Sequence, residues 1–314
     1  MNKFLEDVLK GLSAPDKFLE SKYFYNAKGD ALFQQIMKCP EYYPTRCEMD
    51  IFTNQTNQLA SALTMQHSEF DIFELGAGDA TKSFYLLKCL TEKKVNFTYF
   101  PVDISKNVID SLHQSLPQKI NGLKVYGLNG EYLEMLAKAK TLSDKTKVVL
   151  FLGGNAGNVP LSKAAEFFAL MRQHLLPGDL VLTGFDLKKD PLTILNAYND
   201  KAGFTRDFNL NLLSRINSEL NSNFIIDNFY HFPAYDPLTG ACKSYLVSCK
   251  EQEVNITGNH FSFRQGETIF MEIAQKYTIK QTEDLAKQSG FIPVCNFLDS
   301  NKWFLDTLWK HTPE

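Results

Sequence analysis

One stretch, residues 71–87, limits the folds open to this chain more than any other. Apolar residues alternate along its first part, as they do in a buried strand of a parallel sheet. Gly76 and Gly78 then break the strand, because glycine lacks a Cβ and adopts positive φ angles. From about Asp79 the apolar residues recur at helical spacing. A strand, a glycine turn and a helix N-terminus together provide bare backbone and N–H donors for a nucleotide-like ligand.

Two ligand classes use such a turn, and neighbouring residues favour one of them. A dinucleotide-binding turn has a third glycine where this chain has Thr81. Asp79 would also place a carboxylate against the pyrophosphate. S-adenosylmethionine carries no phosphate and presents an ammonium, a sulfonium and a ribose diol, which suit acidic neighbours. The turn therefore favours a methyltransferase, with nucleotide binding and a plain strand-to-helix turn as the alternatives.

Further strands predict the class of fold. Strand patterns begin near residues 71, 97, 123, 148 and 180, and a helical segment separates each from the next. This rhythm is typical of an open, mostly parallel α/β sheet. The strand at 147–152 is apolar on both faces and should be central. The C-terminal tail is expected to return to the edge of the sheet.

Several local expectations accompany this sheet. Residues 40–46 contain two prolines, which predicts irregular structure. Residues 48–65 read as one amphipathic helix, and residues 123–128 as the third strand.

Two features follow strands of the predicted sheet. Asp103 comes at the carboxyl end of the second strand, 27 residues after Gly76, where an acid accepts both hydroxyls of a ribose. It can also cap the helix that follows, and the two roles are compatible. Residues 153–160, after the fourth strand, hold three glycines and two asparagines, which indicates backbone lying close to a ligand.

Composition excludes several classes of function. The net charge of −3 gives no electrostatic footprint for nucleic acid, and no apolar run is long enough to cross a membrane. The six cysteines have no CxxC spacing and no HExxH motif occurs, so we expect reduced thiols and no metal. The cytoplasm is the expected location.

Several motifs together resemble one family, the S-adenosylmethionine-dependent histidine-specific Nα-methyltransferases of ergothioneine biosynthesis. The resemblance covers nearly the whole chain in family order. Its most specific motifs are Pro-Glu-Tyr-Tyr-Pro-Thr-Arg at 40–46 and Asp-Leu-Lys-Lys-Asp-Pro at 186–191. Other matching segments are 25–29 with 32–33, 74–78, 151–153 with 157–158, 197–200, 202–211 and 267–277.

The resemblance implies a two-domain enzyme of the α/β class. A Rossmann-like class I methyltransferase core, residues 60–190 and 285–314, would bind S-adenosylmethionine. A smaller α+β cap, residues 1–59 and 191–284, would bind the amino acid that accepts the methyl group.

The resemblance also implies the residues of both sites. The expected cofactor contacts are Gly76, Gly78, Lys82, Asp103, Glu131 and Tyr132. Lys82 would place a cation beside the methionine carboxylate, although an exposed helix lysine is the plain alternative. The expected substrate contacts are Tyr42, Asn158, Tyr198, Glu272 and Ala274, and Tyr25 and Asn158 are the expected catalytic residues.

Two departures from the family pattern concern the acceptor. Ala274 stands where the family has a serine that grips the imidazole, and Ser244 stands in place of a methionine. A lost hydrogen-bonding group weakens discrimination for histidine by roughly 1–3 kcal/mol if the site stays buried.

The predicted function is methyl transfer to the α-amino nitrogen of an amino acid, with L-histidine as the first candidate. N-methylation of another amino acid or small amine is the alternative within the class, and a nicotinamide-dependent oxidoreductase is the alternative outside it. We expect a small-molecule amino-acid substrate, no nucleic-acid or membrane partner, and a monomer or weak homo-oligomer.

Overall fold

The computed structural model describes residues 2–312, which divide into two compact units. Among these residues, the first unit comprises 2–43 and 189–274, and the second comprises 44–188 and 275–312. We call the second the sheet unit and the first the cap unit, and we describe each by itself.

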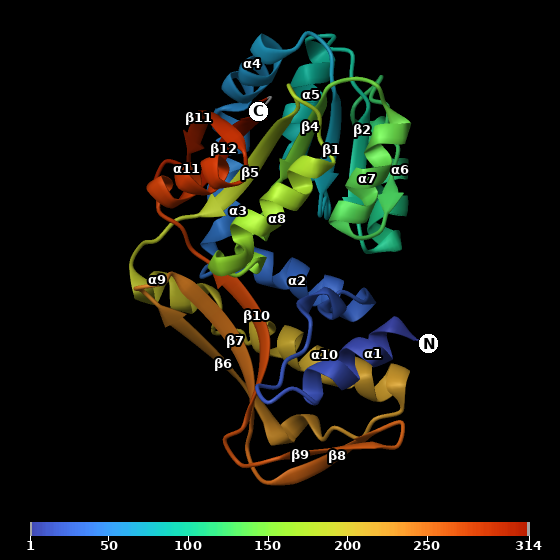
Figure 1. The fold of residues 1–314 in the computed structure, drawn as a ribbon, viewed down its shortest axis with the longest axis vertical. Helices are drawn as coiled ribbons and strands as arrows, with labels where there is room; N and C mark the ends of the chain where they lie inside the picture. The colour runs from blue at the N-terminus through green and yellow to red at the C-terminus, as the bar shows by residue number, and fades with distance from the viewer. Residues whose placement is uncertain (1, 313–314) are drawn as a thin grey trace. The chain divides into compact units, whose positions relative to one another are not determined.

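The sheet unit is built on a seven-stranded sheet in the order β11-β12-β5-β4-β1-β2-β3 (Figure 1). Neighbouring strands from β5 to β3 are parallel, whereas β12 runs antiparallel to both β5 and β11. The strands are β1 (Asp71–Leu75), β2 (Tyr99–Asp103), β3 (Leu128–Asn129), β4 (Lys147–Phe151), β5 (Leu180–Asp186), β11 (Phe291–Leu298) and β12 (Phe304–His311). The predicted Rossmann-like α/β sheet is confirmed, with β4 at its centre.

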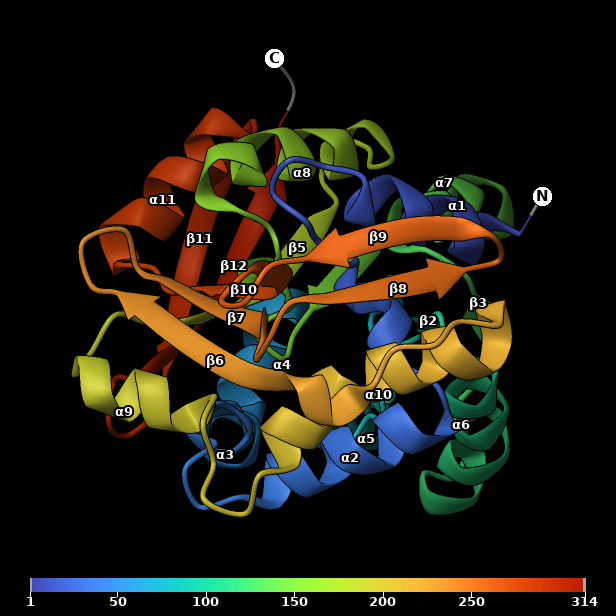
Figure 2. The ribbon, with the colours of Figure 1, turned by 90° about the horizontal axis from the view of Figure 1, so that it is seen from below.

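Helices cover both faces of this sheet, as a parallel sheet requires. Figure 2 shows α7, α8 and α11 on one face and α4, α5 and α6 on the other. The helices are α3 (Tyr43–Asn54), α4 (Thr56–Gln66), α5 (Ser83–Glu92), α6 (Lys106–Lys119), α7 (Tyr132–Leu142), α8 (Leu161–Gln173), α11 (Ile279–Gln288) and the 3₁₀ helix η2 (Asn155–Asn158). Apolar residues of β1, β2, β4 and β5 form one continuous core with α7, α8 and α11.

Four local expectations for this unit were wrong. Residues 40–46 are not wholly irregular, because α3 begins at Tyr43 and its first turn accommodates Pro44. The single helix expected at 48–65 is two helices that break at Gln55. The third strand is only two residues long, with an isolated bridge from Val125 to Tyr99 before it. The C-terminal tail does not lie at the edge, since β12 inserts between β5 and β11.

The cap unit combines a three-stranded sheet, in the order β10-β7-β6, with a hairpin and helices. Its strands are β6 (Phe229–Asp236), β7 (Ala241–Ser248), β8 (Gln252–Ile256), β9 (Asn259–Phe263) and β10 (Thr268–Gln275). Its helices are α1 (Lys3–Leu12), α2 (Ala27–Lys38), α9 (Pro191–Ala197), α10 (Phe204–Leu220) and the 3₁₀ helices η1 (Ser21–Phe24) and η3 (Ile226–Asn228). Helices α1, α2 and α10 share a core with strands β6 to β10.

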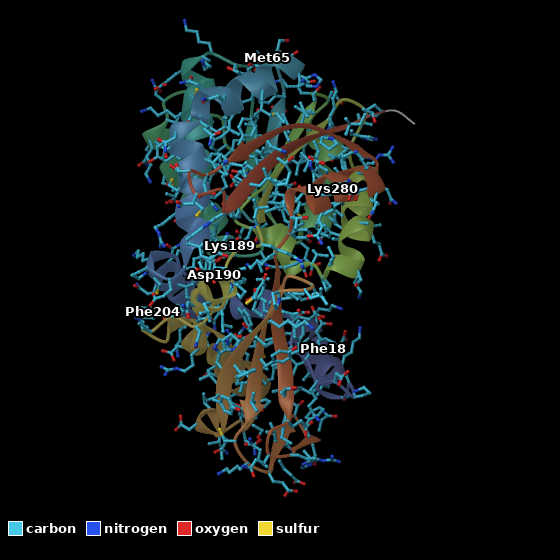
Figure 3. The ribbon with its side chains drawn as sticks, turned by 90° about the vertical axis from the view of Figure 1, so that its left-hand side faces the viewer. Phe18, Met65, Lys189, Asp190, Phe204 and Lys280 are labelled. Carbon is cyan, nitrogen blue, oxygen red and sulfur yellow. The ribbon has the colours of Figure 1, made fainter. Side chains whose placement is uncertain are left out.

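The long C-terminal segment of the cap unit begins in the Asp-Leu-Lys-Lys-Asp-Pro motif. Figure 3 labels Lys189 and Asp190 at this point, and Phe204 at the start of α10. Asp190 caps α9, because its Oδ2 accepts a hydrogen bond from the Thr193 N–H at 2.7 Å. Lys189 Nζ donates to the Tyr43 hydroxyl at 2.9 Å and lies 4.2 Å from the centre of its ring.

Two of the segments where the chain passes from one unit to the other, 186–188 and 276–277, are bonded to each other within the sheet unit. The Tyr277 N–H donates to the Asp186 carbonyl at 3.0 Å, and the Lys188 N–H donates to the Tyr277 carbonyl at 2.8 Å. Lys276 Nζ and Asp186 Oδ2 form a buried ion pair at 2.7 Å. The specific motif at 186–191 therefore has a structural role in fixing where the chain leaves the sheet.

The unit boundaries differ from the predicted domain boundaries in three places. Lys189 and Asp190, which we expected in the core, belong to the cap unit. Residues 44–59 and 275–284, which we expected in the cap, belong to the sheet unit. Helix α3 contributes the buried Glu48, which contacts the glycine turn after β4, and α11 packs its Leu285 and Ala286 into the core of the sheet.

Candidate active site

The glycine turn after β1 needs glycine at its first position. Gly76 has a φ of +72°, a left-handed conformation that side chains disfavour. A Cβ at this position would lie 2.7 Å from the Tyr132 hydroxyl and 2.8 Å from Asn155 Nδ2. Gly76 thus lets the ends of β1, the start of α7 and the loop after β4 come together.

Gly78 connects the same turn to the end of β2. Its φ is +54°, and a Cβ at this position would meet open space. Its N–H donates to Asp103 Oδ2 at 3.1 Å, while the Ser105 N–H donates to Asp103 Oδ1 at 2.9 Å. Burial raises the pKa of the Asp103 carboxyl, and these backbone donors oppose the rise.

Asp103 is not the cap of α6. Ser105 occupies the N-cap position and accepts from the Val108 N–H. The alternative that we left open for Asp103 is therefore wrong, and its carboxylate joins two loops at the carboxyl edge of the sheet instead.

Tyr132 is the first residue of α7 and lies near Asp103. Its ring packs edge-on against Phe151, with centroids 5.6 Å apart. Burial, followed by the charge of Asp103, raises the pKa of the Tyr132 hydroxyl above its ordinary value. Glu131 is exposed at the N-cap position of α7. Glu131 and Tyr132, the two predicted cofactor contacts, therefore lie at the edge where β1, β2 and β4 end.

Lys82 occupies the N-cap position of α5 and is not an ordinary surface lysine. Its side chain is 20% exposed, and its ammonium pairs with Glu48, whose side chain has no exposed area. Both oxygens of Glu48 also accept from the Gly153 N–H, at 2.8 and 2.9 Å. Burial lowers the pKa of the Lys82 ammonium, but the charge and hydrogen bond of Glu48 outweigh it and the net shift is upward.

A second buried acid, Glu74, is the next-to-last residue of β1, just before the turn. Tyr99 donates its hydroxyl hydrogen bond to Glu74 Oε2 at 2.5 Å. Burial raises the pKa of Glu74 to about 7, against the lowering effects of Ser83, Tyr99 and Lys82. The turn is therefore surrounded by carboxyl groups, which suits a cationic ligand better than a pyrophosphate.

Asn158 ends η2, the one-turn helix that follows β4, and its side chain is exposed. Gly153 and Gly154 before it have φ angles of +76° and +72°. That this backbone lies close to a ligand stays a prediction. Asn158 belongs to the sheet unit together with all the predicted cofactor residues.

The predicted substrate tyrosines form one aromatic chain in the cap unit. Tyr25 and Phe33 have ring centroids 5.9 Å apart, Phe33 and Tyr42 are 6.4 Å apart, and Tyr42 and Tyr198 are 6.1 Å apart. All three contacts are edge-on, the arrangement that aromatic rings prefer. The sequence motif contained Phe33, but we had assigned no role to it.

Glu272 and Ala274 lie two residues apart on β10, so they point to the same face of the strand. Glu272 is half-buried and Ala274 is 8% exposed. Ser244 lies on β7 and is buried. The acceptor residues of the cap unit are Tyr25, Tyr42, Tyr198, Glu272 and Ala274, and their convergence with Asn158 stays a prediction.

Sequence reasoning missed three residues around the turns. Asn155 approaches Gly76, Glu48 contacts Gly153 and Lys82, and Asp306 of β12 lies beside Glu48. Glu48 lies two residues after the Pro-Glu-Tyr-Tyr-Pro-Thr-Arg motif at 40–46, which was the available signal. Asp306 had no such signal, because its position depends on where β12 enters the sheet. Within residues 2–312 no group of three His, Cys, Asp or Glu side chains is placed to hold a metal, and no helix is long and apolar enough to cross a membrane.

The sheet order, the antiparallel β12 and the glycine turn facing Asp103 define a class I S-adenosylmethionine-dependent methyltransferase. The sequence agrees with this class. The model of the family described as "Histidine-specific methyltransferase, SAM-dependent" matches residues 4–311, and the chain belongs to that family.

Curated relatives support the same assignment. The chain is 32% identical over 273 residues to the histidine N-alpha-methyltransferase of Mycolicibacterium smegmatis, covering 86% of this chain and 83% of that protein. It is 29% identical to ergothioneine biosynthesis protein 1 of Neurospora crassa, covering 93% of this chain and 33% of that protein. It is also 28% identical to a 4-dimethylallyltryptophan N-methyltransferase of Epichloe festucae, covering 61% of this chain and 57% of that protein.

Proposed function

We propose that this enzyme transfers methyl groups from S-adenosylmethionine to the α-amino nitrogen of L-histidine. One observation carries the proposal: a histidine-specific family matches residues 4–311. The turn at Gly76–Gly78 beside the Asp103 carboxylate supports it. The nicotinamide alternative is not favoured, because the family uses S-adenosylmethionine.

The residues of the sheet unit fit S-adenosylmethionine. The open space over Gly78 admits a ligand to the backbone, and the Asp103 carboxylate beside it can accept the hydroxyls of a ribose. Tyr132 and Glu131 are suited to the adenine, and the ammonium of Lys82, on a partly exposed side chain, is suited to the methionine carboxylate. We assign cofactor binding to the sheet unit on these grounds.

The cap unit supplies the groups that an amino acid needs. The hydroxyls of Tyr42 and Tyr198 can hydrogen-bond an α-carboxylate or α-amine, and Glu272 can accept from an imidazole N–H. Asn158 of the sheet unit would supply a further amide to the amine. We assign acceptor binding to the cap unit together with Asn158.

The reaction requires positioning more than acid–base chemistry. When bound, S-adenosylmethionine supplies a methyl group on a sulfonium, which a neutral amine nitrogen can take with loss of one proton. Asn158 and the tyrosines hold the amine, which contributes most of the acceleration by orientation. Burial of the amine favours its neutral form, and Tyr25 or a water accepts the released proton.

Calorimetry tests the identity of the acceptor. L-histidine should bind in the presence of S-adenosylhomocysteine, and tryptophan and other amino acids should bind more weakly. A panel in which histidine fails to bind and another amine succeeds would move the proposal to the alternative acceptor. That alternative has specific support, because Ala274 and Ser244 depart from the family pattern and one relative carries the name of a tryptophan-derivative methyltransferase. Action in the cytoplasm, as a monomer or weak homo-oligomer, stays a prediction.

A further inference from the structure

Two carboxyl groups meet inside the sheet unit, above Gly184 of β5. Asp306 of β12 pairs with Gly184 in the sheet register. A Cβ placed on Gly184 would lie no more than 3.0 Å from Asp306 Oδ1 and from Glu48 Oε1. Both side chains are fully buried. Glu48 and Asp306, which are far apart in the sequence, therefore present their carboxyl oxygens to the same point.

The two carboxyl groups have very different partners. Glu48 accepts from the Gly153 N–H and pairs with the Lys82 ammonium. Neither oxygen of Asp306 receives a hydrogen bond from any residue in the described part of the chain. A buried carboxylate that lacks both a donor and its own counter-ion is strongly disfavoured, whereas a protonated carboxyl can donate to a neighbouring carboxylate.

We propose that Glu48 and Asp306 share one proton, and that this pair acts as a positioning unit for Lys82 and the Gly153 N–H at the methionine end of the cofactor. The inference rests on the proposed function for the identity of that cofactor. Glu48 and Asp306 are positioning residues, because they act through Lys82 and Gly153.

The charge of the cluster explains why one proton matters. With the proton present, Glu48, Asp306 and Lys82 carry no net charge together, and Lys82 can turn its ammonium to an incoming carboxylate. With both acids ionised, the cluster would carry a net negative charge and repel that carboxylate. Burial, followed by repulsion from Glu48, raises the pKa of the Asp306 carboxyl well above its ordinary value, in agreement with a retained proton.

Ligand binding tests the positioning role. S-adenosylhomocysteine carries a homocysteine carboxylate that corresponds to the methionine carboxylate of the cofactor, and 5′-methylthioadenosine lacks it, so their affinity ratio isolates that end of the site. Glu48→Gln should weaken S-adenosylhomocysteine about tenfold in calorimetry and leave 5′-methylthioadenosine unchanged, because Asp306 then ionises and draws the ammonium toward β12. Glu92→Gln on α5, an exposed acid, is the matched control and should change neither. Equal weakening of both ligands in Glu48→Gln would overturn the proposal.

Infrared difference spectra test the shared proton directly. At about pH 8, above the pKa of about 7 of Glu74, the native protein should show the band of a buried protonated carboxyl. That band should disappear in Asp306→Asn and in Glu48→Gln and persist in Glu92→Gln. No band in the native protein, or a band that persists in Glu48→Gln, would refute a shared proton.

A second pair of variants covers the case in which Glu48→Gln does not fold. Asp306→Asn keeps a donor to Glu48 and Asp306→Leu removes it, so S-adenosylhomocysteine should bind more weakly to the leucine variant by about tenfold. Equal affinities in the two variants would contradict the proposal. If the native protein bound neither nucleoside, the proposed function would fail, and the infrared experiment would still decide whether the proton is shared.

Discussion

The backbone N–H of Gly78 donates a hydrogen bond to Asp103 Oδ2 at 3.1 Å. This contact joins the turn after β1 to the end of β2. It also orients a carboxylate at the edge where the parallel strands end, which is the edge where α/β sheets bind ligands.

Replacing Asp103 by asparagine should weaken cofactor binding. The amide of asparagine has only one acceptor oxygen and no charge, so it can no longer accept hydrogen bonds from both ribose hydroxyls. The affinity for S-adenosylhomocysteine should therefore fall about 10- to 100-fold in calorimetry. Asp110→Asn on α6 is the control, since that acid is exposed and forms an ion pair with Lys106. Unchanged affinity in Asp103→Asn would show that the ribose does not lie against this carboxylate.

Alanine at the two glycines of the turn should produce different defects. Gly76→Ala should lower the free energy of unfolding by about 2 kcal/mol or more, because its Cβ would meet Tyr132 and Asn155 at a left-handed φ. Gly78→Ala should cost only about 1 kcal/mol, because its Cβ meets open space. Its methyl group should nevertheless weaken S-adenosylhomocysteine binding. Urea unfolding and calorimetry measure the two effects, and similar stabilities for the two variants would contradict this assignment.

Glu74 should make the protein less stable as the pH rises. Burial raises the pKa of Glu74 in the folded state from 4.5 to about 7. Its contribution to the free energy of unfolding is therefore complete below the unfolded-state pKa and is lost as the pH rises through about 7. Between about pH 5 and pH 8 the native free energy of unfolding should fall by about 2–3 kcal/mol more than that of Glu74→Gln. Urea unfolding at both pH values measures this difference. Parallel pH profiles for the native protein and Glu74→Gln would show that the Glu74 pKa is not raised.

Restoring serine at position 274 should sharpen discrimination among acceptors. Ala274→Ser places a hydroxyl on the face of β10 that also carries Glu272, where it can hydrogen-bond an imidazole nitrogen. The ratio of kcat/KM for histidine to that for tryptophan should rise about tenfold. Ala234→Ser on β6 serves as the comparison at a half-exposed position. If both variants shift the ratio equally, Ala274 does not line the acceptor site.

The parts of the fold that depend on local pattern were predictable from the sequence. The turn after Leu75, the parallel strands and the place of Asp103 each follow from residues near one another in the chain. Residues 40–46 were misjudged because proline breaks a helix interior yet suits its first turn, where α3 begins. The insertion of β12 between β5 and β11 was missed because an antiparallel pairing over so long a sequence separation leaves no local signal.

The candidate site divides in the same way. Gly76, Gly78, Lys82 and Asp103 lie at turns with recognisable chemistry, and the structure brings them together with Tyr132. Glu48 and Asp306 were not assigned, because a buried acid in a helix and another in a strand resemble ordinary sequence until the tertiary fold places them beside each other. Interactions of this kind depend on packing between distant segments and not on spacing.

The most direct test of this account is a methyl-transfer assay with S-adenosylmethionine and L-histidine, read by mass spectrometry of the amino acid. We expect histidine to gain one to three methyl groups on its α-amino nitrogen, with S-adenosylhomocysteine formed in equal number. Histidine that stays unmodified would contradict this account, whether another amine of a broad panel is methylated or no amine is.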